Sequence, residues 1–163
     1  MAVDMFIKIG DIKGESADAK HKGEIDVLAW SWGLTQSGNM HAGSGGGSGK
    51  ASFQDLSFTK PVDTASSALM DACANGSHIP KALLAVRKAG GDSGPVEYIK
   101  ITMEEIIVSS VSTGGSSGEE RLTENVTLNF AIIGYEYWTQ KADGSPDAAF
   151  PFGFNIRTSA PSS

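Results

Sequence analysis

The sequence predicts a mainly β fold, an antiparallel β-barrel of two sheets with one short flanking α-helix. Three observations support this prediction. Apolar residues recur at every second position along most of the chain, which is typical of strands with one buried face. Short glycine- and serine-rich turns separate these segments and fit antiparallel connections. A single segment has helical spacing, and closing the sheets into a barrel would remove their exposed edges.

The first predicted strands are residues 3–9 and 24–34. In the first, apolar side chains share one parity as far as Gly10. In the second, bulky side chains occupy one face and small ones occupy the other, where they include Ala29, Ser31 and Gly33. Alternation resumes over residues 51–59, and Pro61 ends that strand because it has no backbone N–H to donate.

Residues 64–74 predict the one helix. Asp63 or Thr64 can cap its start, and Asn75–Gly76 can end it. Apolar side chains recur there at helical spacing, namely Ala65, Ala68, Leu69, Ala72 and Cys73. This narrow face of small residues suits packing against the wall of a barrel.

Four more strands follow the helix. They are residues 81–89, 96–111, 121–138 and a last run from Phe150 to Ile156. In the third of these, apolar residues alternate with polar ones, which are Thr123, Asn125, Thr127 and Asn129. This is the clearest half-buried strand in the chain.

The whole chain, residues 1–163, is predicted to be a single domain. Residues 36–50 are rich in glycine and predict a long flexible loop, and the tail is expected to fray from about residue 158. A linker between two domains is the alternative for 36–50. Because the strands on both sides are short and similar, a functional loop is the better interpretation.

Composition excludes some partners. The formal net charge is −6 and the sequence pI is about 5.0, so no basic surface is predicted that would bind nucleic acid or an anionic membrane. The lone Cys73 cannot form an intrachain disulfide, and a buried thiol is the simplest interpretation. No basic segment precedes an apolar stretch near Met1, so we expect synthesis in the cytoplasm without a cleaved signal peptide.

Catalytic motifs are weak. Gly49–Lys50 ends a glycine-rich loop, but Ser44 and Ala51 break the phosphate-loop pattern. Ser116 matches the Gly-x-Ser-x-Gly pattern of hydrolases, yet a strand is predicted to follow it where the hydrolase elbow has a helix. The histidines are far apart in turn-like segments and suggest neither a metal site nor a catalytic base: His21, His41 and His78. We predict no catalytic residue, metal or cofactor.

Two features have both a functional and a neutral interpretation. The small residues around Ser31 suit a surface that stays open and hydrated, but an ordinary exterior face would look the same. Residues 36–50 have too little apolar surface to fold back on their own domain, so ordering them would need a partner surface. A disordered loop without a function is the competing interpretation.

Five segments resemble the hemolysin-coregulated protein (Hcp) family of bacterial type VI secretion. They are FIKIGDIKGES at 6–16, EIDVLAWSWG at 24–33, QDLSFTK at 54–60, VSSVSTGG at 108–115 and LTENVTLNF at 122–130. The resemblance extends from residue 1 to about 157 in the family's order, although the stretch after Trp138 and the tail after Arg157 match loosely.

The resemblance implies a structural, secreted protein without catalysis. It implies hexameric rings that stack into the inner tube of the secretion apparatus, spike and sheath components as partners, and small effector proteins carried in the lumen. It also implies export to the medium or to a target cell by the same apparatus.

Carried over by position, the resemblance implies that Ser31, Ala29 and Gly33 contact the lumen and its effectors. It implies that the glycine-rich loop contacts an adjacent subunit or ring through Gln36, Met40, His41, Gly45, Gly46, Gly47 and Lys50. This loop varies within the family, so its individual contacts are not carried over.

Two alternatives remain open at this point. One is a monomeric β-sandwich binding module that uses Trp30, Trp32 or Trp138 as stacking platforms. The other is a serine hydrolase with Ser116 as its nucleophile.

Overall fold

The computed structural model describes residues 3–41, 49–88 and 94–162. Before the helix these residues form the strands β1 (Val3–Ile9), β2 (Ile25–Asp26), β3 (Ala29–Ser31), β4 (Leu34–Gln36), β5 (Ala51–Phe53) and β6 (Leu56–Pro61). The helix is α1 (Ala65–Asn75), and after it come β7 (Ile79–Lys88), β8 (Val96–Thr113), β9 (Thr123–Gln140), β10 (Pro146–Asn155) and β11 (Ala160–Pro161). The predicted mainly β class with one helix is confirmed.

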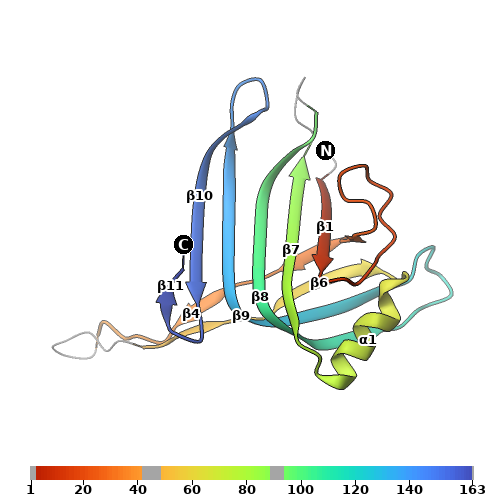
Figure 1. Cartoon of the computed structure of the whole chain (residues 1–163), viewed down its shortest axis with the longest axis horizontal. Coiled ribbons are helices and arrows are strands. Elements are labelled where there is room, and N and C mark those ends of the chain that lie inside the picture. The colour runs from red at the N-terminus through yellow and green to blue at the C-terminus, as the bar shows by residue number, and fades with distance from the viewer. Residues whose placement is uncertain (1–2, 42–48, 89–93, 163) are drawn as a thin grey trace.

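Two antiparallel sheets share the long hairpin β8–β9 (Figure 1). The first sheet has the order β11-β10-β9-β8-β7-β1-β2. The second consists of β3, β6, the first part of β9 and the last part of β8. β8 passes between the sheets near Glu105, which has a φ of 55°, and near a register shift between Val108 and Ser110. Such irregularities bend a strand and turn it into a new direction.

The sequence predicted a closed or nearly closed barrel, and the structure is not a closed one, because the path of paired strands ends at β2 on one side and at β11 on the other. Residues 24–34, predicted as one strand, are instead β2, β3 and β4. The chain changes partners between β2 and β3, where Val27 N donates to Met5 O (3.0 Å) and Leu28 N donates to Thr59 O (2.8 Å). The alternation fails there too, since Val27 is buried and Leu28 is 42% exposed.

The hydrophobic core lies between the two sheets. Its fully buried side chains come from both, for example Ile7, Leu84 and Ile101 from the first and Leu56 and Leu128 from the second. The helix α1 adds further buried side chains, which are Ala65, Leu69 and Ala72. It lies at one end of the two sheets (Figure 1).

The helix begins and ends close to the predicted positions. Asp63 Oδ1 accepts a hydrogen bond from Ala65 N at 2.9 Å, whereas Thr64 Oγ1 donates to Lys13 O at 3.1 Å. Gly76 follows the helix with a φ of 61°, a left-handed conformation that glycine adopts without strain. Within the described ranges, no helix combines the length and apolar character needed to cross a membrane.

The strands β4 and β5 form a separate two-stranded sheet that projects from the body (Figure 1). Gln36, expected in the loop, lies in β4 and pairs with Ala51. A Cβ atom on Gly49 would lie only 2.2 Å from Gly38 N, so this close approach of two backbones requires glycine. In the tail, where fraying was expected, β11 pairs with Phe154 and Asn155.

Candidate interaction surface

The second sheet turns a surface of small polar side chains away from the core, and we call it the polar face. It comprises Ala29, Ser31, Asp55, Ser57, Thr59, Ser109, Ser110, Ser112, Asn125, Thr127 and Asn129. Asp55 is the charged member of this set. The polar face includes Ala29 and Ser31, two of the three residues predicted to contact the lumen.

Strand alternation produces the polar face. Phe58 and Leu128 are buried on β6 and β9, so their neighbours Ser57, Thr59 and Thr127 point to the opposite side of the sheet. The same alternation turns Trp30 toward the core and Ser31 away from it. The polar face therefore follows from the burial of the apolar residues between its members.

The strand register sets small residues side by side across the sheet. One row runs through Ser31, Ser57, Thr127 and Ser110, which pair in that order across β3, β6, β9 and β8. The neighbouring row runs through Ala29, Thr59, Asn125 and Ser112. Ser31 thus lies at the β3 edge of a polar surface that extends across the whole second sheet.

Hydrogen bonds between side chains fix parts of this surface. The two oxygens of Asp55 accept bonds from Ser109 Oγ (2.6 Å) and Asn129 Nδ2 (2.8 Å). Ser110 Oγ lies 2.6 Å from Thr127 Oγ1. Thr59 Oγ1 donates to Asn125 Oδ1 at 2.7 Å. The polar face can therefore bind water and polar groups, but it holds no histidine or cysteine for nucleophilic chemistry.

The other predicted contact residues lie apart from these rows. Gly33 follows β3, and its carbonyl oxygen accepts a hydrogen bond from Gln54 N at 2.9 Å. Met40, His41 and Lys50 are exposed beside the β4–β5 hairpin, and Met40 is 87% exposed. Gly45, Gly46 and Gly47 lie outside the described residues.

Sequence reasoning did not select most members of the polar face. The alternation in residues 121–138 had already marked Asn125, Thr127 and Asn129 as the side opposite the core. Ser109 and Ser110 carry no such signal, because the register shift beside them turns two consecutive residues to the same side. Only the pairing of β3, β6, β9 and β8 brings these residues together.

Ser116 lies in an exposed turn, where its Oγ atom is 3.5 Å from Gly118 N. The strand β9 follows this turn, as the sequence predicted, so the strand-to-helix elbow of a hydrolase is missing. Within the part of the chain that the structure describes, Ser116 forms no hydrogen bond with a histidine. Residues 3–41, 49–88 and 94–162 also contain no group of three potential metal ligands.

The tryptophans proposed as stacking platforms differ in their surroundings. Trp30 and Trp32 are partly buried against the core, and Trp32 stacks on Phe53 with 6.4 Å between ring centroids. Trp138 lies on the first sheet beneath Lys100, whose Nζ is 5.3 Å from its ring centroid. The three rings therefore do not form a common platform.

Comparison with known proteins places the chain in a family. The family model described as "Type VI secretion system effector, Hcp" matches residues 6–137. The chain belongs to the Hcp family. It is 63% identical over 158 residues to Protein hcp1 of Pseudomonas aeruginosa, covering 96% of this chain and 97% of that protein.

Solved structures of Hcp proteins share the fold. One, described as a type six secretion system protein, has a TM-score of 0.90 at 30% identity and covers 99% of this chain and 100% of its own. Hcp1 from Salmonella typhimurium has a TM-score of 0.81 at 40% identity with the same coverage. The predicted family is confirmed, and the chain is a structural protein of the type VI secretion system.

Proposed function

We propose that this Hcp protein forms hexameric rings that stack into the inner tube of the type VI apparatus, with the polar face lining the lumen. One observation carries the proposal. The polar face lies on a sheet whose two edge strands each have an unpaired edge. Among the described residues, β3 pairs only with β6 in the second sheet, and β8 beyond Ile106 pairs only with β9. The two ends of the sheet are therefore different strands.

Two different ends suit a head-to-tail interface, in which one side of a subunit meets the opposite side of the next. Such an interface closes into a ring when its rotation closes. An unpaired strand edge is a template for pairing with another chain. A neighbouring subunit placed there would provide partners for its free backbone N–H and C=O groups. The polar faces of successive subunits would then form one continuous inner surface.

Exposed aromatic side chains on the first sheet support association as well. Phe150, Phe152 and Tyr137 lie on one face of β9 and β10, and Phe150 is 57% exposed. Contiguous apolar surface of this kind is typical of protein interfaces. We assign this aromatic face to a second copy of the chain.

The chemistry of the polar face suits a hydrated lumen. Small hydroxyl and amide side chains offer hydrogen bonds without filling the space, and Asp55 already accepts two of them. In this arrangement Ser31, Ala29 and Gly33 contact small effector proteins. The loop residues Gln36, Met40, His41, Gly45, Gly46, Gly47 and Lys50 contact the next subunit or ring, and the tube meets spike and sheath components of the apparatus.

The rings assemble in the bacterial cytoplasm, and the apparatus exports the protein with its cargo.

Negative-stain electron microscopy of the purified protein tests the assembly. Rings with an open centre at micromolar concentration are the expected result. A protein that stays monomeric at millimolar concentration would contradict the proposal and favour a monomeric binding module.

A further inference from the structure

Residues 10–24, which we call the strap, cover part of the first sheet on the side away from the core. Phe6 and Ala85 pair across β1 and β7, point away from the core and are nevertheless buried. The strap is held together by its own backbone, with bonds from Gly14 N to Gly23 O (2.8 Å) and from Gly23 N to Ser16 O (2.9 Å). It therefore contacts the sheet as a formed unit.

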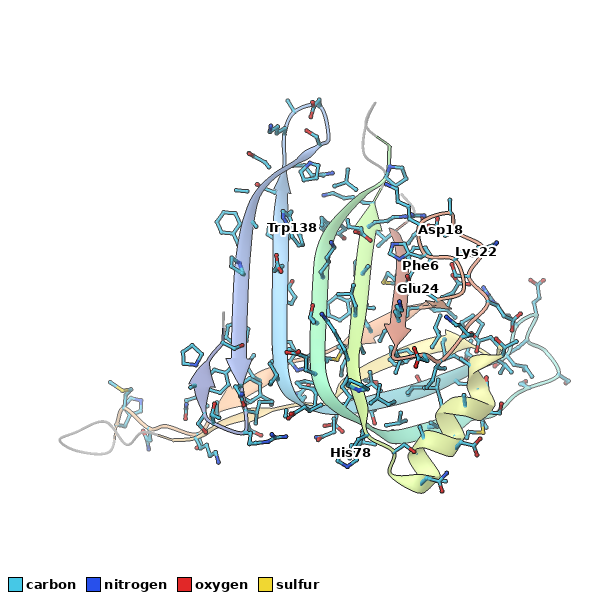
Figure 2. The ribbon with its side chains drawn as sticks, in the orientation of Figure 1. Phe6, Asp18, Lys22, Glu24, His78 and Trp138 are labelled. Atoms are coloured by element: carbon cyan, nitrogen blue, oxygen red, sulfur yellow. The ribbon has the colours of Figure 1, made fainter. Side chains whose placement is uncertain are left out.

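His21 packs directly against the sheet. Its ring stacks on Phe6 with 4.5 Å between centroids, and the residue is only 7% exposed. Nδ1 lies 3.0 Å from Glu24 Oε1, and Nε2 lies 2.7 Å from Glu97 Oε1 on β8. Figure 2 shows Phe6 on β1 and Glu24 in the strap beside this strand.

Both ring nitrogens of His21 thus face a carboxylate. A carboxylate only accepts hydrogen bonds, and a neutral imidazole has a single N–H to donate. Only the doubly protonated ring donates to both partners, and such charge-assisted bonds are stronger than neutral ones. We propose that the charged form of His21 holds this part of the strap on the sheet, and that loss of its proton loosens residues 19–22 from the sheet.

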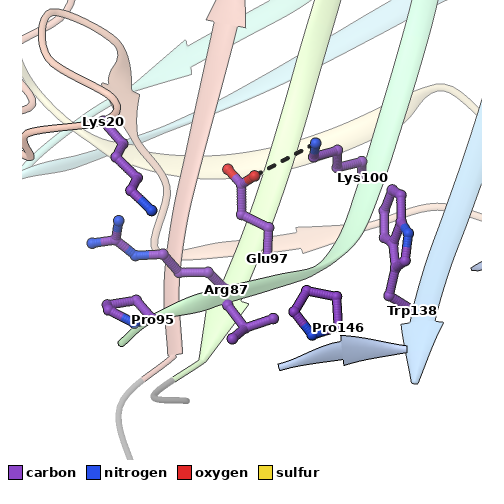
Figure 3. Close-up of a pocket in the computed structure, with 8 residues that line it drawn as sticks. Lys20, Arg87, Pro95, Glu97, Lys100, Trp138 and Pro146 are labelled. Atoms are coloured by element: carbon purple, nitrogen blue, oxygen red, sulfur yellow. Dashed lines mark ion pairs between the residues drawn. The ribbon is translucent and has the colours of Figure 1, made fainter. Parts of the chain in front are cut away.

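The surrounding charges belong to four segments. Arg87 on β7 binds Asp18 of the strap, with NH1 2.9 Å from Oδ2, and its guanidinium lies 5.0 Å from the Phe6 ring centroid. Asp4 on β1 lies 3.4 Å from the same guanidinium. Lys100 on β8 lies 3.5 Å from Glu97. Lys20 of the strap lines a pocket together with Arg87, Glu97 and Lys100 (Figure 3).

These neighbours determine what happens when His21 becomes neutral. Glu97 keeps its ion pair with Lys100, so it does not need His21 as a partner. Among the described residues, the side chain of Glu24 is hydrogen-bonded to His21. Asp18 stays bound to Arg87, because the hydrogen bond from Arg87 lowers the pKa of this carboxyl to about 2. Residues 19–22 therefore lose their contact with β8, while Asp18 and the backbone bonds of Gly14 and Ser16 keep the rest of the strap in place.

The strap lies on the opposite side of the molecule from the polar face, because the two sheets share one core and turn their other faces outward. Opening of the strap would therefore change the outer surface without altering the polar face. The inference stands whether or not the chain forms rings, since every group in it belongs to one chain.

Nuclear magnetic resonance of the ring nitrogens, combined with limited trypsin digestion, tests the proposal on the full chain. Lys20 and Lys22 flank His21 and are exposed, so trypsin reports strap opening directly. As the pH rises, we expect the His21 ring to lose one proton and cleavage after Lys20 and Lys22 to accelerate at least fivefold over the same range. A synthetic peptide of residues 15–26 corrects for the pH dependence of trypsin itself.

Two variants sharpen the test. His21→Phe keeps the stack on Phe6 but removes both hydrogen bonds, so its strap should be cleaved rapidly at every pH. His78→Phe changes an exposed histidine and should leave the wild-type profile intact. A neutral His21 ring under conditions where the strap resists trypsin would overturn the proposal, and so would cleavage that does not follow the protonation of His21.

Discussion

Lys60 Nζ lies 2.8 Å from Glu124 Oε1, and the two side chains are 0% and 1% exposed. Asp63 Oδ1 lies 2.8 Å from the same ammonium, and Ser66 Oγ binds Glu124. These contacts join β6, β9 and the start of α1. One lysine therefore compensates two buried carboxylates at the point where the helix meets the second sheet.

Removing this lysine should be costly. Lys60→Met leaves the charges of Glu124 and Asp63 without a cation, and breaking a buried pair in this way costs about 3–5 kcal/mol in unfolding free energy. Urea denaturation measures the loss. Arg157→Met is the matched control, because the Arg157–Glu105 pair is exposed and such pairs contribute little. Equal stability of the two variants would show that the buried pair is dispensable.

Thr113→Pro tests pairing at the β8 edge. Val62 N donates to Leu122 O, so alternation along β9 turns the backbone of Glu124 toward β6, and the N–H of its β8 partner Thr113 points to the unpaired side. Proline there removes no bond within the subunit but blocks pairing with a neighbour. We expect rings to disappear in electron microscopy while the circular dichroism spectrum is unchanged. Thr113→Val keeps the N–H and should still form rings. Normal rings in the proline variant would exclude this edge as an interface.

Ser31→Gln tests the assignment of the polar face to the lumen. The longer side chain fills space beside Ser57, so effector binding should weaken roughly tenfold, about 1.4 kcal/mol, while rings persist. Co-purification of a bound effector with the rings measures this change. Thr102→Gln, on the other sheet, is the control and should bind effector as the wild type does. Undiminished binding by the Ser31 variant would count against the lumen assignment.

The aromatic face on β9 and β10 gives a separate prediction. Replacing Phe150 and Phe152 with serine should abolish rings while changing monomer stability by less than about 0.5 kcal/mol per site, because both side chains are exposed. Analytical ultracentrifugation and thermal denaturation measure the two effects. Phe150→Tyr preserves the aromatic surface and should assemble. If the serine variant forms rings, a second copy does not cover this face.

Acid stability depends in part on Asp18. Arg87 lowers the pKa of this carboxyl to about 2, below the roughly 3.9 of an unfolded chain. The pair therefore stabilises the fold above about pH 4, and this contribution is lost as the pH falls toward 2. The stability difference between wild type and Asp18→Asn, followed by urea denaturation, should shrink over that range. Asp11→Asn, at an exposed position, is the control for the loss of one negative charge.

The sequence by itself determined the mainly β class, the position of the one helix and the family. The alternation of buried and exposed residues is a local property of a strand. Runs such as residues 3–9 and 121–138 could therefore be predicted as strands from their own sequence. Capping is local as well, which is why Asp63 and Gly76 marked the ends of α1. The segments that resemble the Hcp family likewise lie within single runs of the chain.

The tertiary structure decided which strands are neighbours, and local patterns do not encode this. The change of partners between Val27 and Leu28 splits a predicted strand, because one end pairs with β1 and the other with β6. The polar face and the His21 contacts arise in the same way. Ser31 meets Ser57, and His21 meets Glu97, only because pairing brings distant residues together. Long-range pairing therefore determined the surfaces on which the proposed functions depend.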